Sequence, residues 1–110
     1  MRLPTHLQVS ALIRRVQAAG GFATVLARGE RDAGTLLVVL CERGAKSTAY
    51  ERMPLPDGTR KWTPAKVADP DDPRGFSVYL DRRKAQDPDL WMVELDVHDG
   101  ERFIADLTDC

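Results

Sequence analysis

Few side chains in this chain could hold a metal ion, and their spacing forms no complete ligand set. His6 and His98 fall on different expected elements, and neither has a second His or Cys at the short spacing of a zinc site. Asp69, Asp71 and Asp72 share one loop, as in part of a calcium-binding loop, but the glycine and the closing glutamate of that loop are missing. We therefore expect no bound metal and no other cofactor.

An activated nucleophile is not indicated either. Cys41 lies in an apolar run, where a thiol is buried and inert, and Cys110 is the last residue of the sequence. No serine stands in the glycine-flanked turn that presents a catalytic hydroxyl. We therefore assign no catalytic residue.

One enzyme hypothesis comes from the order of the expected elements. Helix, three strands, helix and strand is also the core order of restriction-endonuclease-like nucleases, which bind a divalent metal through an Asp and a Glu-x-Lys motif. Asp32 could supply the first carboxylate, but Glu42-Arg43-Gly44 and Glu51-Arg52-Met53 both lack the lysine. A metal-dependent hydrolase or nuclease with a degenerate motif, to which Asp87 and Asp89 could contribute, is therefore one alternative.

Two basic segments are candidates for binding. Arg60-Lys61-Trp62 joins positive charge to an aromatic ring, and Arg82-Arg83-Lys84 clusters positive charge on an expected helix. Such groups anchor protein interfaces, and they also pair with phosphates and stack on bases. The competing interpretation is that Trp62 covers a sheet edge and the second cluster is a solvated helix face. The candidate interaction surface comprises Arg60, Lys61, Trp62, Arg82 and Arg83.

The elements that must position these residues begin with a helix over Thr5–Ala19. Its apolar positions recur at helical spacing, at Val9, Leu12, Ile13 and Val16. Thr5 and Gln8 fit a capping box, in which the Thr hydroxyl accepts from the Gln amide. The pair Gly20-Gly21 ends the helix.

Strands and a second helix follow. The apolar run in Thr35–Glu42 suits a central strand that is covered on both faces. Residues 64–75 hold three prolines and are expected to form an exposed loop. Phe76–Gln86 fits both a strand and a helix, and we favour the helix because Asp72-Pro73 resembles a helix start. The other predicted strands are Phe22–Arg28, Ser47–Met53 and a short edge strand, Thr59–Thr63.

The segment Asp87–Leu107 is predicted to close the chain as a β-hairpin. A three-residue loop, His98-Asp99-Gly100, with Gly100 in the left-handed conformation, gives one wholly apolar face. The pairs on that face are Trp91 with Leu107, Val93 with Ala105 and Leu95 with Phe103.

Together these elements predict an α/β chain of α+β order that forms a single compact domain over residues 1–110. We expect one mostly antiparallel or mixed sheet of about five strands, with two helices on opposite faces and a β-hairpin at the end.

The composition, with 43% hydrophobic and 30% charged residues, is that of a folded globular protein. The net charge of −1 does not call for a general polyanion-binding surface. The longest apolar run, residues 36–41, is far shorter than the roughly 20 residues that span a bilayer, and the first residues lack the apolar block of a signal peptide. We expect a cytoplasmic protein without membrane contact.

Three blocks of the sequence, in the same order, resemble a bacterial family of small proteins known as domain of unknown function 1491. The blocks are RLPTHLQVSALIRRVQAAGGFATV, RGERDAGTLLVVL and DPDLWMVELDVHDGERFI. The resemblance covers most of the chain and is weakest over Pro54–Gly75. It implies a compact cytoplasmic α/β protein and carries over no activity and no site residues.

The function that this pattern favours is a non-enzymatic interaction or regulatory module with a protein partner, because a well-patterned fold carries no reactive constellation. A weak nucleic-acid binder that uses the basic segments is the other alternative beside the metal-dependent enzyme. The sequence indicates no oligomeric state.

Overall fold

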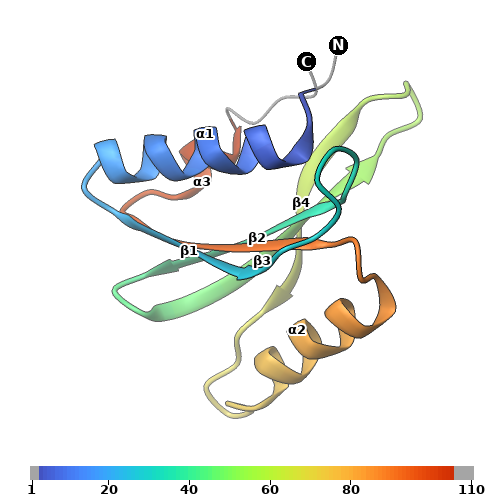
Figure 1. Ribbon diagram of the computed structural model, residues 1–110. Helices are drawn as coiled ribbons and strands as arrows, with labels where there is room; N and C mark the ends of the chain where they lie inside the picture. The colour runs from blue at the N-terminus through green and yellow to red at the C-terminus, as the bar shows by residue number, and fades with distance from the viewer. Residues whose placement is uncertain (1–2, 106–110) are drawn as a thin grey trace.

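The computed structural model describes residues 3–105, and within them five strands form one mixed sheet in the order β1-β5-β2-β3-β4 (Figure 1). Three helices accompany the sheet: α1 (Thr5–Ala18), α2 (Gly75–Gln86) and the short α3 (Glu101–Ala105). The strands are β1 (Phe22–Ala27), β2 (Leu36–Glu42), β3 (Ala45–Pro54), β4 (Arg60–Val67) and β5 (Trp91–Asp96). The predicted α+β architecture is confirmed.

The centre of the sheet is a parallel pair, β2 beside β5, whose register runs from Leu36 opposite Trp91 to Cys41 opposite Asp96. All other neighbouring strands are antiparallel. Each residue of β2 from Leu36 to Cys41 is buried, so the prediction of a central strand covered on both faces is confirmed.

The two long helices lie on opposite sides of this sheet, as Figure 1 shows and as the packing requires. Side chains alternate between the faces of a strand, so β2 and β5 contribute to two separate apolar clusters. The α1 face holds Leu12, Val38 and Val93, and the α2 face holds Val39 and Met92. The segment left open between strand and helix, Phe76–Gln86, is therefore a helix, α2.

The predicted closing β-hairpin is wrong, because residues 101–105 form the helix α3. Strand β5 already has β1 on one side and β2 on the other, so no edge is left for a returning strand. As a helix, the segment buries Ile104 in the cluster below α1. Asp99, with φ of 58°, takes the left-handed conformation that was predicted for Gly100. The predicted partner of Trp91, Leu107, and the thiol of Cys110 lie outside the described residues.

The glycine at position 100 instead leaves room for the Leu40 side chain to pack closely against the backbone. A Cβ atom on Gly100 would lie 2.9 Å from the Leu40 Cδ2 atom. The predicted short edge strand exists, but β4 continues to Val67 through part of the expected loop. Pro64 is tolerated inside β4 because this strand is an edge and its register shifts beside Tyr50.

Helix α2 is held to the sheet by a half-buried charge cluster. Its residue Arg83 donates from Nη2 to Glu51 Oε1 at 2.6 Å and from Nε to Glu51 Oε2 at 3.2 Å. The Tyr79 hydroxyl donates to Glu51 Oε2 at 2.6 Å. Because α2 buries no residue completely, this cluster and three half-buried apolar side chains carry its attachment: Phe76, Tyr79 and Leu80.

The cluster shifts the titration of both acids. Burial raises the pKa of Tyr79 to about 12, with the hydrogen bond to Glu51 and the charge of that carboxylate acting in the same direction. Burial would also raise the pKa of Glu51, but the hydrogen bonds from Arg83 and Tyr79 outweigh it and leave that pKa below its ordinary value.

Among the described residues, no helix is both long and apolar enough to cross a membrane.

Replacing the anchoring arginine should destabilise the fold. Arg83→Ala leaves the half-buried Glu51 carboxylate without its bidentate partner, and we expect the free energy of unfolding to fall by about 2 kcal/mol in urea denaturation. The neighbouring exposed Arg82 is the matched control, since Arg82→Ala should change stability by less than about 0.5 kcal/mol. Equal effects of the two substitutions would contradict the anchoring role.

The two tyrosines should titrate at unusually high pH. In an ultraviolet absorbance titration we expect the Tyr79 transition near pH 12 and the Tyr50 transition above its ordinary position, since burial and the nearby Glu101 raise that pKa too. Tyr79→Phe should remove only the former. Because the folded pKa of Tyr79 is raised, its contribution to stability is complete below about pH 10 and is lost as the pH rises through about 12. Ionisation of Tyr79 near pH 10 in protein that circular dichroism shows to be folded would contradict the cluster.

Candidate functional site

The β3–β4 hairpin places the residues of the segment Arg60-Lys61-Trp62 on two different faces of the sheet. Arg52 lies opposite Trp62 and Pro54 lies opposite Arg60, so these residues share the face that α1 covers. Lys61 lies between Arg60 and Trp62 in sequence and therefore points to the other face. Of the three residues that were predicted to act together, the structure brings together two.

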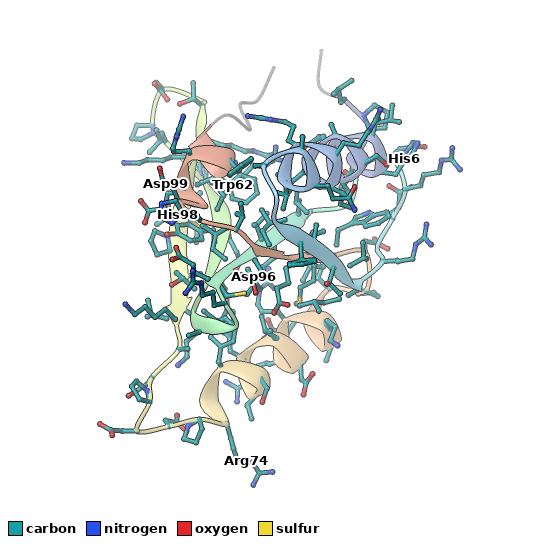
Figure 2. All side chains as sticks on the ribbon, turned by 90° about the vertical axis from the view of Figure 1, so that its left-hand side faces the viewer. His6, Trp62, Arg74, Asp96, His98 and Asp99 are labelled. Carbon is teal, nitrogen blue, oxygen red and sulfur yellow. The ribbon has the colours of Figure 1, made fainter. Side chains whose placement is uncertain are left out.

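Trp62 is half-buried and packs against the apolar cluster below α1. Figure 2 shows its side chain on the side of the sheet that α1 covers. The guanidinium of Arg52 lies over the indole ring, 4.8 Å from its centroid. Trp62 therefore holds the Arg52 guanidinium in position by a cation–π contact. Only part of the Trp62 side chain is exposed to solvent.

The start of α1 supplies the opposite wall of this site. Thr5 is the first helical residue and follows Pro4, so the predicted capping box is wrong: the Thr5 hydroxyl donates to the Gly34 carbonyl at 2.7 Å. The Gln8 side chain does reach back, and it donates to the Leu3 carbonyl at 2.7 Å. The side-chain oxygen of Gln8 accepts from Arg52 Nη2 at 2.5 Å, which ties α1 to β3.

These elements and the loop before β2 enclose a cavity of about 230 Å³, which we call the arginine cavity. Figure 1 shows the start of α1, this loop and the hairpin converging at one end of the molecule. Two arginines, Arg52 and Arg60, reach the cavity, and Arg60 is exposed. The other lining residues are Leu3, Thr5, Gln8, Asp32, Ala33, Gly34, Thr35 and Leu36.

Asp32 is the one acidic side chain that lines this cavity within the described part of the chain. Its carboxylate lies 3.9 Å from His6 Nδ1 and is 70% exposed, so it belongs to the solvated rim. The described lining of the cavity therefore includes two guanidinium groups, which are suited to binding an anionic ligand.

The second basic segment lies elsewhere. Arg83 is committed to Glu51, as described above, and Arg82 is exposed on α2, on the opposite side of the sheet from the arginine cavity (Figure 1). The five predicted surface residues thus divide between the two faces: Arg60 and Trp62 lie on the α1 face, while Lys61, Arg82 and Arg83 lie on the α2 side.

The residues considered for metal chemistry are dispersed. His6 and His98 lie on different sides of the molecule in Figure 2, and His98 is 90% exposed beside Glu42, with 3.4 Å between Nδ1 and Oε1. The Asp87 carboxylate accepts from the Asp89 backbone N–H at 3.1 Å, which is turn chemistry. Within residues 3–105, no three His, Cys, Asp or Glu side chains gather in an arrangement that could hold a metal ion.

The thiol considered as a nucleophile is buried. Burial raises the pKa of Cys41, and the charges of Glu94 and Asp96 raise it further. A thiol in this setting stays protonated at neutral pH, whereas a reactive cysteine needs a lowered pKa.

Sequence reasoning missed the two residues that complete the cavity, Arg52 and Gln8. Arg52 was considered only within a broken nuclease motif, and Gln8 only as a helix cap. The turn-forming residues 54–58 were a usable signal, because they place the two flanking strands in antiparallel register and bring Arg52 beside Trp62.

The comparisons with known proteins agree on one family. The chain matches the family described as "Protein of unknown function (DUF1491)" over residues 3–105. No curated protein matches it. A crystal structure of a DUF1491 protein from Caulobacter crescentus CB15 is 35% identical with a TM-score of 0.76, and the match covers 92% of this chain and 94% of that one.

Two solution structures are similar as well. An NMR structure of a DUF1491 protein from Caulobacter crescentus CB15 is 34% identical with a TM-score of 0.76, covering 94% of each chain. Protein Atu0922 from A. tumefaciens is 31% identical with a TM-score of 0.72, covering 94% of this chain and 93% of that one. The three blocks of sequence and the matching fold lead to one conclusion: this chain belongs to the DUF1491 family, for which no function is assigned.

Proposed function

We propose that this protein is a non-enzymatic interaction module that binds a protein partner through the α1 face of the β3–β4 hairpin. The observation that carries the proposal is the convergence of Arg52 and Arg60 on one cavity beside the half-buried Trp62. Interface hot spots are enriched in arginine and tryptophan that are fixed in position and flanked by pockets. Here the tryptophan fixes one arginine, and the other stays exposed to a partner.

A protein partner is favoured over nucleic acid by the distribution of charge. Arg60 lies on the opposite side of the sheet from Lys61, Arg82 and Arg83, and Arg83 is neutralised by Glu51. A nucleic-acid surface needs a continuous basic stripe along the path of the phosphates. The separated arginines and the net charge of −1 argue for a smaller, local contact.

We further propose that the protein acts in the cytoplasm. Cys41 is a free, buried thiol in the described structure. Free thiols of this kind fit a reducing compartment, where stability comes from an apolar core rather than from disulfides.

The proposal predicts that a single charge reversal abolishes partner binding. Affinity capture from a nuclease-treated lysate of the native host should retain a stoichiometric protein partner with the wild type. Arg60→Glu should lose this partner, because the substitution reverses the charge that the partner contacts. Arg82→Glu is the control for net charge, and it should retain the partner. Trp62 is unsuitable for this test, since it packs against the core and Trp62→Ala should lower stability.

Equal retention by Arg60→Glu and the wild type would contradict the proposed surface. Retention that disappears with nuclease treatment would instead support the nucleic-acid alternative.

A further inference from the structure

We propose that the arginine cavity binds a carboxylate group carried on a short aliphatic stem, as in an acidic side chain. This inference rests on the proposed function and deepens it, because it names the chemical group that the partner presents. Four features of the cavity support it: its charge, the fixed position of Arg52, its size and its apolar lining.

The positive charge is directed by two guanidinium groups from adjacent strands. Arg52 is on β3 and Arg60 is on β4, and both side chains reach the same cavity from the same face of the hairpin. Within the described residues, no carboxylate forms an ion pair with Arg60. A guanidinium is planar and offers paired N–H donors at the spacing of carboxylate oxygens, so the site favours a bidentate ligand.

Arg52 is held in place before any ligand arrives. Gln8 accepts a hydrogen bond from its Nη2 atom, and the Trp62 ring lies 4.8 Å from its guanidinium carbon. Gln8 is itself oriented by its hydrogen bond to the Leu3 carbonyl. A donor that is fixed in the unbound protein loses little conformational entropy on binding, which raises affinity.

The loop that forms the remaining wall is also fixed. The Glu30 carboxylate accepts from the backbone N–H groups of Asp32, at 2.9 Å, and Ala33, at 2.5 Å. The Glu30 carbonyl accepts from Trp91 Nε1 at 2.7 Å, and the Gly34 carbonyl accepts from Thr5. The cavity is therefore bordered by restrained elements rather than by a loop that must order on binding.

The dimensions limit the ligand to one small group. A volume of about 230 Å³ is below the range of about 300–1,000 Å³ that holds drug-sized molecules. Part of the lining is apolar, from Leu3, Ala33 and Leu36. A bare phosphate would leave this part unfilled, whereas an Asp- or Glu-like group places its methylenes there and its carboxylate at the arginines.

Asp32 at the rim weakens the binding of a carboxylate in the cavity. Its carboxylate at the rim repels an anion, although high exposure lets solvent screen the repulsion. Asp32→Asn should therefore strengthen carboxylate binding a few-fold, which is the opposite direction from any arginine substitution. A change in this direction would not follow from general damage to the fold.

The test is an amide NMR titration of the full chain with two probes that carry the same chemistry from different sources. One probe is free glutarate and the other is a glutamate-rich peptide; glutaramide and inorganic phosphate are the neutral and stemless controls. We expect shifts of the Gly34 and Thr35 amides with a carboxylate probe, a loss of about tenfold or more in affinity for Arg60→Gln, and no change for Arg82→Gln. Arg52→Lys, which keeps the charge but not the planar fork, should also weaken binding.

The two probes separate the sources of the carboxylate. Binding of the peptide but not of glutarate would support an acidic segment of a protein partner, and comparable binding of both would support a site for a small carboxylate. The proposal is overturned if neither probe shifts the cavity amides, if Arg60→Gln binds as the wild type does, or if phosphate binds as tightly as the carboxylate probe that shifts them. Arg60→Gln decides the matter if Arg52→Lys fails to fold, because Arg60 is exposed.

The outcomes remain separable from those of the proposed function. A captured partner that is lost in Arg60→Glu, without any carboxylate binding, would leave the interaction module standing and remove the carboxylate site. Carboxylate binding without a captured partner would leave the carboxylate site standing and remove the proposed interaction module.

Discussion

The parallel pairing of β2 with β5 is the constraint on which the rest of this structure depends. Two parallel neighbours cannot be joined by a tight turn, so the chain must leave the end of β2 and return to the start of β5 through a long connection. That connection, residues 43–90, contains the β3–β4 hairpin and α2. Because both faces of β2 are buried, α1 must cover one face and α2 the other.

The same pairing brings distant loops into contact and creates the wall of the arginine cavity. The turn before β5 meets the loop before β2, where the Asp89 carbonyl accepts from the Glu30 backbone N–H at 3.0 Å. A Cβ atom on Gly29 would lie 2.0 Å from the Asp89 carbonyl oxygen, and one on Gly34 would lie 2.3 Å from it. Glycine is required at both positions because backbones, rather than side chains, are in contact there. The loop is thus fixed between α1 and β5, and the site beside it is preformed.

Two arginines that look alike in sequence have different roles because their surroundings differ. Arg83 is bound to a half-buried carboxylate and serves the attachment of α2, whereas Arg60 is exposed on the rim of a cavity. Arg52 is intermediate, since it is half-buried and held by both Gln8 and Trp62. An arginine that is already positioned and borders a cavity is suited to binding.

The sequence by itself predicted α1, the five strands that the structure contains and the central place of β2, since periodicity and apolar runs are local properties. It also indicated Arg60 and Trp62. Only the tertiary structure decided that residues 101–105 form a helix, because the occupied edges of β5 depend on pairings with residues far away in the chain. The hydrogen bond between Arg52 and Gln8 was also decided by the tertiary structure, because it requires the start of α1 to lie beside the C-terminal end of β3. Local patterns specify elements, whereas sites arise from the long-range pairings that the elements form.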